Sequence, residues 1–179
     1  MSTFVLINAS CVEQEVDAIV NAANNCLCFG GGVCDVIFRK AGVSQLQEAC
    51  SVYKTPLKDG DAVITPAFQI RNATHIIHAV GPNFFVTPTA FQELFDAYYH
   101  SLCVLMENRL HSIAFPLISA GIFGLGLPNP PAESTKQCCL AYQKFVSDYP
   151  KYDIDVRLCA FTEGEMREAR IVFDSMQAQ

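Results

Sequence analysis

The chain has 179 residues, of which 51% are hydrophobic, so we expect one compact domain over residues 1–179. The formal net charge of −6 removes the long-range attraction on which nucleic-acid binders rely, which argues against a nucleic-acid partner. No apolar run approaches the roughly 20 residues of a membrane span, and no basic-then-apolar leader follows Met1. We therefore expect a soluble cytoplasmic protein without a membrane partner, and a monomer.

The chain contains nine cysteines, an odd number that cannot all pair within one molecule. Cys26 and Cys28 lie closer together than zinc ligands usually do, and Cys138 and Cys139 are adjacent. Single cysteines also occur inside apolar segments, at Cys11, Cys50, Cys103 and Cys159. We expect buried reduced thiols that behave as small hydrophobes, with no metal site and no cofactor.

The first half of the chain alternates apolar strands with amphipathic helices. In chain order we expect strands over residues 4–8 and 18–20, a helix over 33–41, a helix from 44 that ends before Pro56, and strands over 62–65 and 76–80. Gly42 is placed to end the first helix and Ser44 to cap the second, whereas Pro66 would halt the third strand.

The second half continues this alternation. Apolar residues recur at spacings of three and four between Pro88 and Leu110, which predicts a long amphipathic helix. A strand over 113–117, a helix over 133–146, a strand over 156–160 and a closing helix over 163–176 follow. The pattern predicts an α/β fold in which helices cover both faces of a largely parallel sheet.

Two glycine-rich loops, residues 30–32 and 121–126, each come soon after an apolar strand. In open α/β sheets the ligand crevice lies beyond the carboxyl ends of the strands, so we expect these loops to form a cleft. Before the first loop, Asn21 and Asn24 bring two carboxamides to the strand end. Bare glycine backbone and a helix start then offer amide donors to an anion. On this stretch alone, a tight turn that needs positive φ remains the alternative.

Neither loop matches a better-known nucleotide motif. A Walker A loop requires a lysine that both loops lack, and a Rossmann fingerprint requires an acidic residue about 20 positions later that residues 30–32 do not supply convincingly. No serine occupies a nucleophile elbow, so a hydrolase triad of that kind is also excluded.

Four motifs, in the same order along the chain, resemble those of the macrodomain family. They are residues 17–24 (DAIVNAAN), 30–33 (GGGV), 75–82 (HIIHAVGP) and 115–124 (FPLISAGIFG). The sequences of residues 31–34, 38–42 and 60–66 look most like those of stand-alone bacterial macrodomains. The resemblance implies a three-layer α/β/α fold around a mixed, mostly parallel sheet. It also implies that the partner is ADP-ribose or an ADP-ribosylated protein.

The resemblance assigns a role to each part of the cleft. Asn24 would face the distal ribose, and the backbone of residues 30–33 would hold that ribose and the neighbouring phosphate. Residues 119–123 would wrap the diphosphate, Phe123 would pack on the distal ribose, and Phe161 would stack on adenine. The implied ligand-binding residues are Ser10, Cys11, Ala22, Asn24, Gly30, Gly31, Gly32, Val33, Ser119, Ala120, Gly121, Ile122, Phe123 and Phe161.

Two positions depart from the family pattern. Many macrodomains carry an aspartate that accepts a hydrogen bond from adenine where this chain has Ser10, and the loss of a charged acceptor costs about 1–3 kcal/mol. One hydrolase class has an aspartate that positions the attacking water where this chain has Cys34. Asp35 follows, but a shift of one residue rotates a side chain by about 100° around the helix.

The resemblance implies hydrolysis of mono-ADP-ribosyl linkages on proteins, or of O-acetyl-ADP-ribose. The water would be held between the ligand phosphate, the glycine loop and Asn24, and the catalytic candidates are Asn24 and Asp35. A non-catalytic ADP-ribose reader is the alternative.

Several side chains admit a structural reading beside the functional one. Asp35 either orients water or is a solvated helix residue, and Cys34 is a packed helix residue rather than a nucleophile. His78 alternates with apolar residues and reads as a core histidine rather than a general base. Residues 125–131 either reshape the distal-ribose end of the cleft or form a prolyl connection that starts the next helix.

Overall fold

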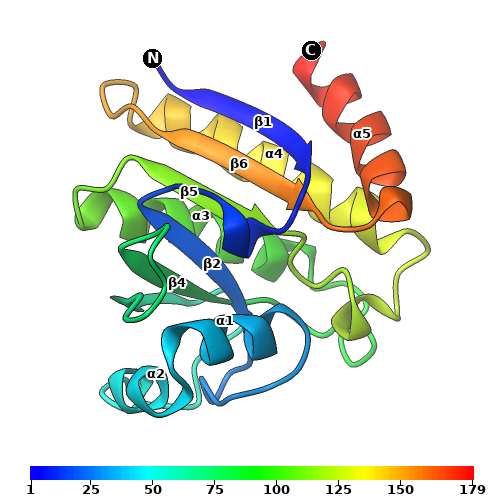
Figure 1. Ribbon diagram of the computed structural model, residues 1–179. Coiled ribbons are helices and arrows are strands. Elements are labelled where there is room, and N and C mark those ends of the chain that lie inside the picture. Colours follow the sequence, from blue (N-terminus) through cyan, green and yellow to red (C-terminus); the bar gives the residue numbers. More distant parts are fainter.

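The computed structural model describes residues 1–179 and contains one six-stranded sheet with five α-helices (Figure 1). The strands are β1 (Thr3–Asn8), β2 (Ala18–Ala23), β3 (Ala62–Pro66), β4 (His75–Val80), β5 (Ser112–Pro116) and β6 (Asp155–Ala160). The helices are α1 (Val33–Ala41), α2 (Val43–Cys50), α3 (Phe91–Glu107), α4 (Pro130–Asp148) and α5 (Glu163–Gln177), with short 3₁₀ turns at Cys11–Glu13 and Ile122–Gly124.

The strand order is β1-β6-β5-β2-β4-β3. Only β3 runs antiparallel to its neighbour, and the other pairs are parallel. The predicted mixed, mostly parallel sheet is therefore confirmed. Because five strands run the same way, the loops that follow β1, β2, β4, β5 and β6 all leave from one edge of the sheet.

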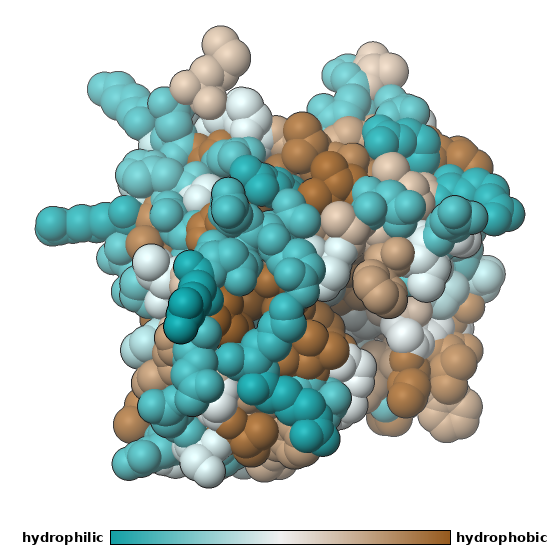
Figure 2. Space-filling model, viewed as in Figure 1, coloured by the Kyte–Doolittle hydropathy of each residue, from teal (hydrophilic) through white to brown (hydrophobic).

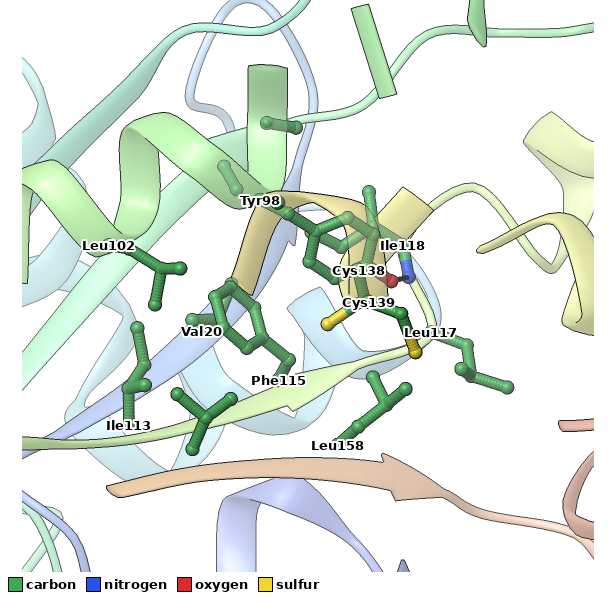
Figure 3. Close-up of a cluster of buried hydrophobic side chains, with 14 of the residues drawn as sticks. Val20, Tyr98, Leu102, Ile113, Phe115, Leu117, Ile118, Cys138, Cys139 and Leu158 are labelled. Atoms are coloured by element: carbon green, nitrogen blue, oxygen red, sulfur yellow. Dashed lines mark hydrogen bonds between the residues drawn. The ribbon is translucent and has the colours of Figure 1, made fainter. Parts of the chain in front are cut away.

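Helices cover both faces of the sheet, as predicted, and give three layers. Helices α1 and α2 lie on one face, whereas α3, α4 and α5 lie on the other (Figure 1). Successive strand residues point to opposite faces, so Val20 joins the core under α3 and α4 while Ile19 joins the core under α1 and α2. Figure 3 shows the larger core, where Tyr98 packs edge-on against Phe115 at a ring distance of 5.1 Å.

Several predicted boundaries were wrong. Strand β2 continues to Ala23, so Asn21 lies inside the strand and not at its end. Gly42, at φ +106°, both ends α1 and precedes the first residue of α2, so Ser44 lies within the helix and caps nothing. Edge strand β3 extends one residue beyond the predicted range and ends at Pro66, the residue predicted to halt it. Asn129 caps α4 three residues earlier than predicted, and prolines occupy its first turn.

All nine cysteines are free thiols. Those at Cys26 and Cys28 are exposed, which corrects the expectation of uniformly buried thiols. The loop after β2 carries both residues. Among the five helices, none combines the length and the apolar character that crossing a membrane would require.

Candidate functional site

The predicted cleft would lie at the ends of β2 and β5, two neighbouring strands whose chains depart to opposite faces of the sheet. After β2 the chain passes through the glycine loop, residues 24–32, into α1 on one face. After β5 it passes through the second loop, residues 117–129, into α4 on the other face. Since β2 and β5 are adjacent and parallel, this divergence is a topological switch point, where α/β sheets open a crevice for ligands.

The glycine loop presents unpaired amide donors to open space. Gly32, at φ +64°, is the N-cap of α1 and forms no side-chain cap. The backbone N–H groups of Gly31, Gly32, Val33 and Cys34 have no acceptor within the protein. A Cβ atom built on Gly31 or Gly32 would meet no heavy atom within 4 Å. These features suit anion binding at a helix start. The positive φ of Gly32 is also what the turn alternative predicts.

The second loop offers donors from the other side of the cleft. The N–H groups of Gly121, Ile122 and Phe123 have no acceptor within the protein, and a Cβ atom on Gly121 would also point into open space. Ser119 adopts φ +58°, and its hydroxyl turns inward to donate to the Pro82 carbonyl at 2.7 Å. The Ser119 side chain therefore supports the loop and leaves only its backbone for a ligand.

A buried tyrosine fixes the start of the second loop. The Tyr98 hydroxyl accepts from the Ile118 N–H at 2.9 Å and lies 2.6 Å from Ser134 Oγ, which donates to the Ile118 carbonyl at 2.6 Å. Figure 3 shows Tyr98 reaching from α3 toward Ile118. Helices α3 and α4 thus hold the backbone immediately before Ser119.

Asn24 organises its own loop. Its Oδ1 accepts from the N–H groups of Cys26 and Cys28 at 3.2 and 3.0 Å, and its Nδ2 donates to the Cys28 carbonyl at 2.9 Å. The amide nitrogen lies 3.4 Å from the position of a Cβ atom on Gly30. A primary amide has two N–H donors, so one remains for a ligand beside the glycines.

The other carboxamide predicted at the strand end, Asn21, lies in the core instead. It is only 1% exposed, and its Nδ2 lies 3.1 Å from His78 Nδ1 and 3.7 Å from Cys34 Sγ. The other ring nitrogen of His78 lies 2.9 Å from Thr65 Oγ1. Burial lowers the pKa of His78 to about 4, so the ring is neutral and the core-histidine interpretation is supported.

The two residues that follow Val33 differ in environment. Cys34 is buried, with Sγ 3.7 Å from the Cys28 carbonyl, and burial raises the pKa of the thiol. A protonated buried thiol is a poor nucleophile. Asp35 Oδ1 accepts from Arg39 Nε at 2.8 Å along the exposed face of α1. This ion pair favours the interpretation of Asp35 as a solvated helix residue. The catalytic role of Asp35 stays a prediction.

At the far end of the edge, β1 and β6 bring Ser10, Cys11 and Phe161 to one side of the cleft. Ser10 Oγ accepts from the Val12 N–H at 3.3 Å and caps the first 3₁₀ turn. The Cys11 thiol points inward toward the Val20 carbonyl, so only its backbone is available. Phe161 directly follows β6 and is 72% exposed, which leaves its ring free to stack.

A further segment supports the second loop, and its sequence pointed to it only through the family resemblance. Residues 81–90 follow β4 and brace the second loop through Ser119 and through a 2.7 Å bond from the Phe84 N–H to the Phe123 carbonyl. A Cβ atom on Gly81 would lie 2.4 Å from Ser119 Oγ, so this close approach requires glycine. Gly81 is part of the 75–82 motif, so the family resemblance was the only sequence signal for this segment.

A shallow hollow at residues 149–152 lies near the opposite edge of the sheet, before β6.

Comparison with known proteins agrees with this geometry. The sequence model of the Macro domain family matches residues 20–137. The chain is 41% identical over 163 residues to "ADP-ribose glycohydrolase MACROD1" of Rattus norvegicus, an alignment that covers 89% of this chain and 60% of that protein. The chain thus spans less than two thirds of this relative. It is also 37% identical over 152 residues to "O-acetyl-ADP-ribose deacetylase" of Salmonella gallinarum, covering 83% of this chain and 82% of that protein.

A solved structure extends the agreement to the backbone. The Oceanobacillus iheyensis macrodomain, determined with ADP, superposes with a TM-score of 0.88 at 28% identity and covers 99% of this chain and 93% of that one. The residues that the family model matches, 20–137, include the glycine loop and the second loop. The chain belongs to the macrodomain family.

Proposed function

We propose that this chain binds ADP-ribose in the cleft between β2 and β5 and hydrolyses the bond that attaches it to a protein side chain or to an acetyl group. The observation that carries the proposal is the presence of two rows of unpaired amides, one in the glycine loop and one in the second loop, at the switch point. The names of the rat and Salmonella relatives support the same chemistry.

The diphosphate fits between the two rows because backbone N–H groups hold anions without requiring basic side chains. An acidic protein can therefore bind an acidic ligand. Adenine would stack on Phe161 beside Ser10, and the distal ribose would lie against Asn24 and Phe123. With the ligand in this orientation, the protein or acetyl group linked to the distal ribose lies at the end of the cleft farther from β1 and β6.

For the reaction, a water would be held between the ligand phosphate, the glycine loop and Asn24. Its oxygen would bond to the anomeric carbon as the bond from that carbon to the protein side chain breaks and releases the side chain. With the acetyl ester, it would add to the carbonyl carbon, and the ribose oxygen would then leave with the proton taken from the water. Cys34 is protonated and Asp35 is engaged by Arg39, so the ligand's own phosphate is the anion best placed to take the water's proton. Asn24 would orient the ribose, and Asp35 is the second catalytic candidate.

A non-catalytic reader is the second candidate function. The sequence feature that favours it is the absence of aspartate at Ser10 and at Cys34. A reader would use the same amides to bind the ligand but would leave the linkage intact.

The two functions separate in one assay with a protein that carries labelled mono-ADP-ribose. We expect the label to be released by the wild type and by Asn25→Ala, which removes a neighbouring exposed carboxamide, but to be retained with Asn24→Ala. Binding without release by the wild type would establish a reader. If calorimetry found no binding of ADP-ribose at millimolar concentration, both functions would be excluded.

A further inference from the structure

Four large apolar side chains are exposed at one end of the cleft. Phe85 and Val86 are each 73% exposed, Ile122 is 78% exposed and Leu125 is 70% exposed. We call these four residues the apolar rim. Figure 2 shows brown surface at the lower right, over the 81–90 and 117–129 loops that Figure 1 draws there.

The apolar rim belongs to two loops that are bonded to each other. The Phe84 N–H donates to the Phe123 carbonyl at 2.7 Å. A Cβ atom on Gly126 would lie 2.1 Å from the Phe84 carbonyl oxygen, so the backbones are in direct contact beside Leu125. The Val86 N–H also donates to the Asn83 carbonyl at 3.1 Å. The rim is thus held in place by the backbone and does not depend on burial of its side chains.

Neither loop contains a charged residue. Residues 81–90 and 117–129 include no aspartate, glutamate, lysine or arginine, although 17% of the chain is charged. Exposed apolar side chains on loops without charged residues favour apolar contact over ion pairing. The apolar rim therefore suits a partner that presents apolar side chains.

The position of the rim identifies which part of a substrate reaches it. Ile122 precedes Phe123, the residue that the proposed function places on the distal ribose. The distal ribose is the part of ADP-ribose through which a protein is linked. A polypeptide attached there has to leave the cleft beside the rim, whereas adenine lies toward Phe161.

We propose that the apolar rim binds the polypeptide that flanks an ADP-ribosylated side chain, with a preference for apolar residues next to the modified one. The inference rests on the proposed function, because it uses the direction of the ligand in the cleft. Four side chains expose on the order of several hundred Å², which is less than the roughly 800 Å² that each partner buries in a standard protein interface. This area suits a short peptide segment better than a second copy of the chain.

The test measures affinity and not turnover, so it does not depend on catalysis. Two peptides carry ADP-ribose through the same non-hydrolysable linkage, one flanked by leucines and the other by serines, and free ADP-ribose is the reference ligand. The test variant is Phe85→Ser/Leu125→Ser. The matched control is Ile171→Ser, which replaces an apolar residue that is 65% exposed on α5.

We expect the wild type and Ile171→Ser to bind the leucine-flanked conjugate about tenfold more tightly than the serine-flanked one, as burial of some 60 Å² of apolar surface predicts. The double variant should bind both conjugates within about twofold. The Kd for free ADP-ribose should be the same in all three proteins.

Two results would overturn the inference while leaving the proposed function intact. One is equal affinity of the wild type for both conjugates. The other is concentration-dependent dimerisation that the double variant abolishes, because that would assign the apolar rim to a second copy. Failure of the proposed function would look different, since free ADP-ribose itself would not bind.

Discussion

The two asparagines of the 17–24 motif show how position decides what one residue type does. Asn21 lies in β2 on the α1 side of the sheet, so its carboxamide is buried beside His78. Asn24 lies one residue beyond the strand, and its carboxamide holds the loop that leads to the glycines. A ligand at the glycine loop can reach Asn24 but not Asn21.

The proposed function makes the ligand's phosphate, and not Asp35, the group that takes the water's proton. A substitution at Asp35 tests this choice directly. Asp35→Asn breaks the ion pair with Arg39 but removes no contact to the glycine loop, so we expect the hydrolysis rate to stay within about threefold of the wild type. Single-turnover rates with ADP-ribosylated protein measure this, and Glu48→Gln on the exposed part of α2 is the control. A loss of a hundredfold or more would instead make Asp35 the catalytic carboxylate.

At the scale of elements, the cleft depends on the backbone at the start of α1. Gly32 combines φ +64° with ψ −138°, a conformation that side chains with a Cβ atom avoid. Gly31 has no positive φ and faces the same open space. The two neighbours therefore separate the effect of backbone strain from the effect of an added methyl group.

We expect Gly32→Ala to lower the free energy of unfolding by about 1–3 kcal/mol and to weaken ADP-ribose binding by at least tenfold, because the first-turn amides are displaced. Gly31→Ala should leave stability unchanged, because its Cβ atom meets no protein atom, so a loss of affinity in this variant reports only the methyl group in the ligand's space. Urea denaturation and calorimetry measure the two quantities. Equal behaviour of the two variants would show that the conformation of Gly32 does not set the site.

Local sequence patterns were enough to predict the order of the elements and the edge that carries the glycine loops. They failed where a segment far away in the sequence sets a strand boundary or supports a loop. Strand β2 passes Val20 because β4 supplies a ladder partner for each residue up to Ala23, and no local pattern records that pairing. The bracing of Ser119 by Pro82 joins segments 37 residues apart and was equally invisible.

At the scale of the whole molecule, neutral His78 couples stability to pH. Its folded pKa of about 4 lies below the ordinary 6.5, so the unfolded chain binds a proton first as the pH falls. The stability that this ring contributes is complete above pH 6.5 and is lost as the pH falls toward 4. The neighbouring thiols of Cys34 and Cys50 have raised pKa values and stay protonated throughout this window.

We expect the free energy of unfolding to fall by up to about 3 kcal/mol between pH 7 and pH 4 because of His78. Urea denaturation across this range measures the decrease, and His78→Gln should have a correspondingly smaller one. An identical pH dependence in both proteins would show that His78 titrates normally in the folded state.

The protein has a net charge of −6, and its proposed site is built from backbone amides. We therefore expect its affinity for an anionic ligand to depend only weakly on salt. Raising sodium chloride from 50 to 300 mM should change the Kd for ADP-ribose by less than about threefold, because no lysine or arginine neutralises the phosphates. Calorimetry at the two salt concentrations measures this. A steep loss of affinity would instead indicate a basic side chain in the site.

In the proposed complex, unpaired amides of the glycine loop and the second loop receive the diphosphate of ADP-ribose. A titration of the ¹⁵N-labelled protein with ADP-ribose, followed through its amide resonances, tests this most directly. We expect saturable shifts at Gly31, Gly32, Val33, Gly121 and Ile122, with little change at residues 149–152. Saturable binding that left these five amides unshifted would contradict it.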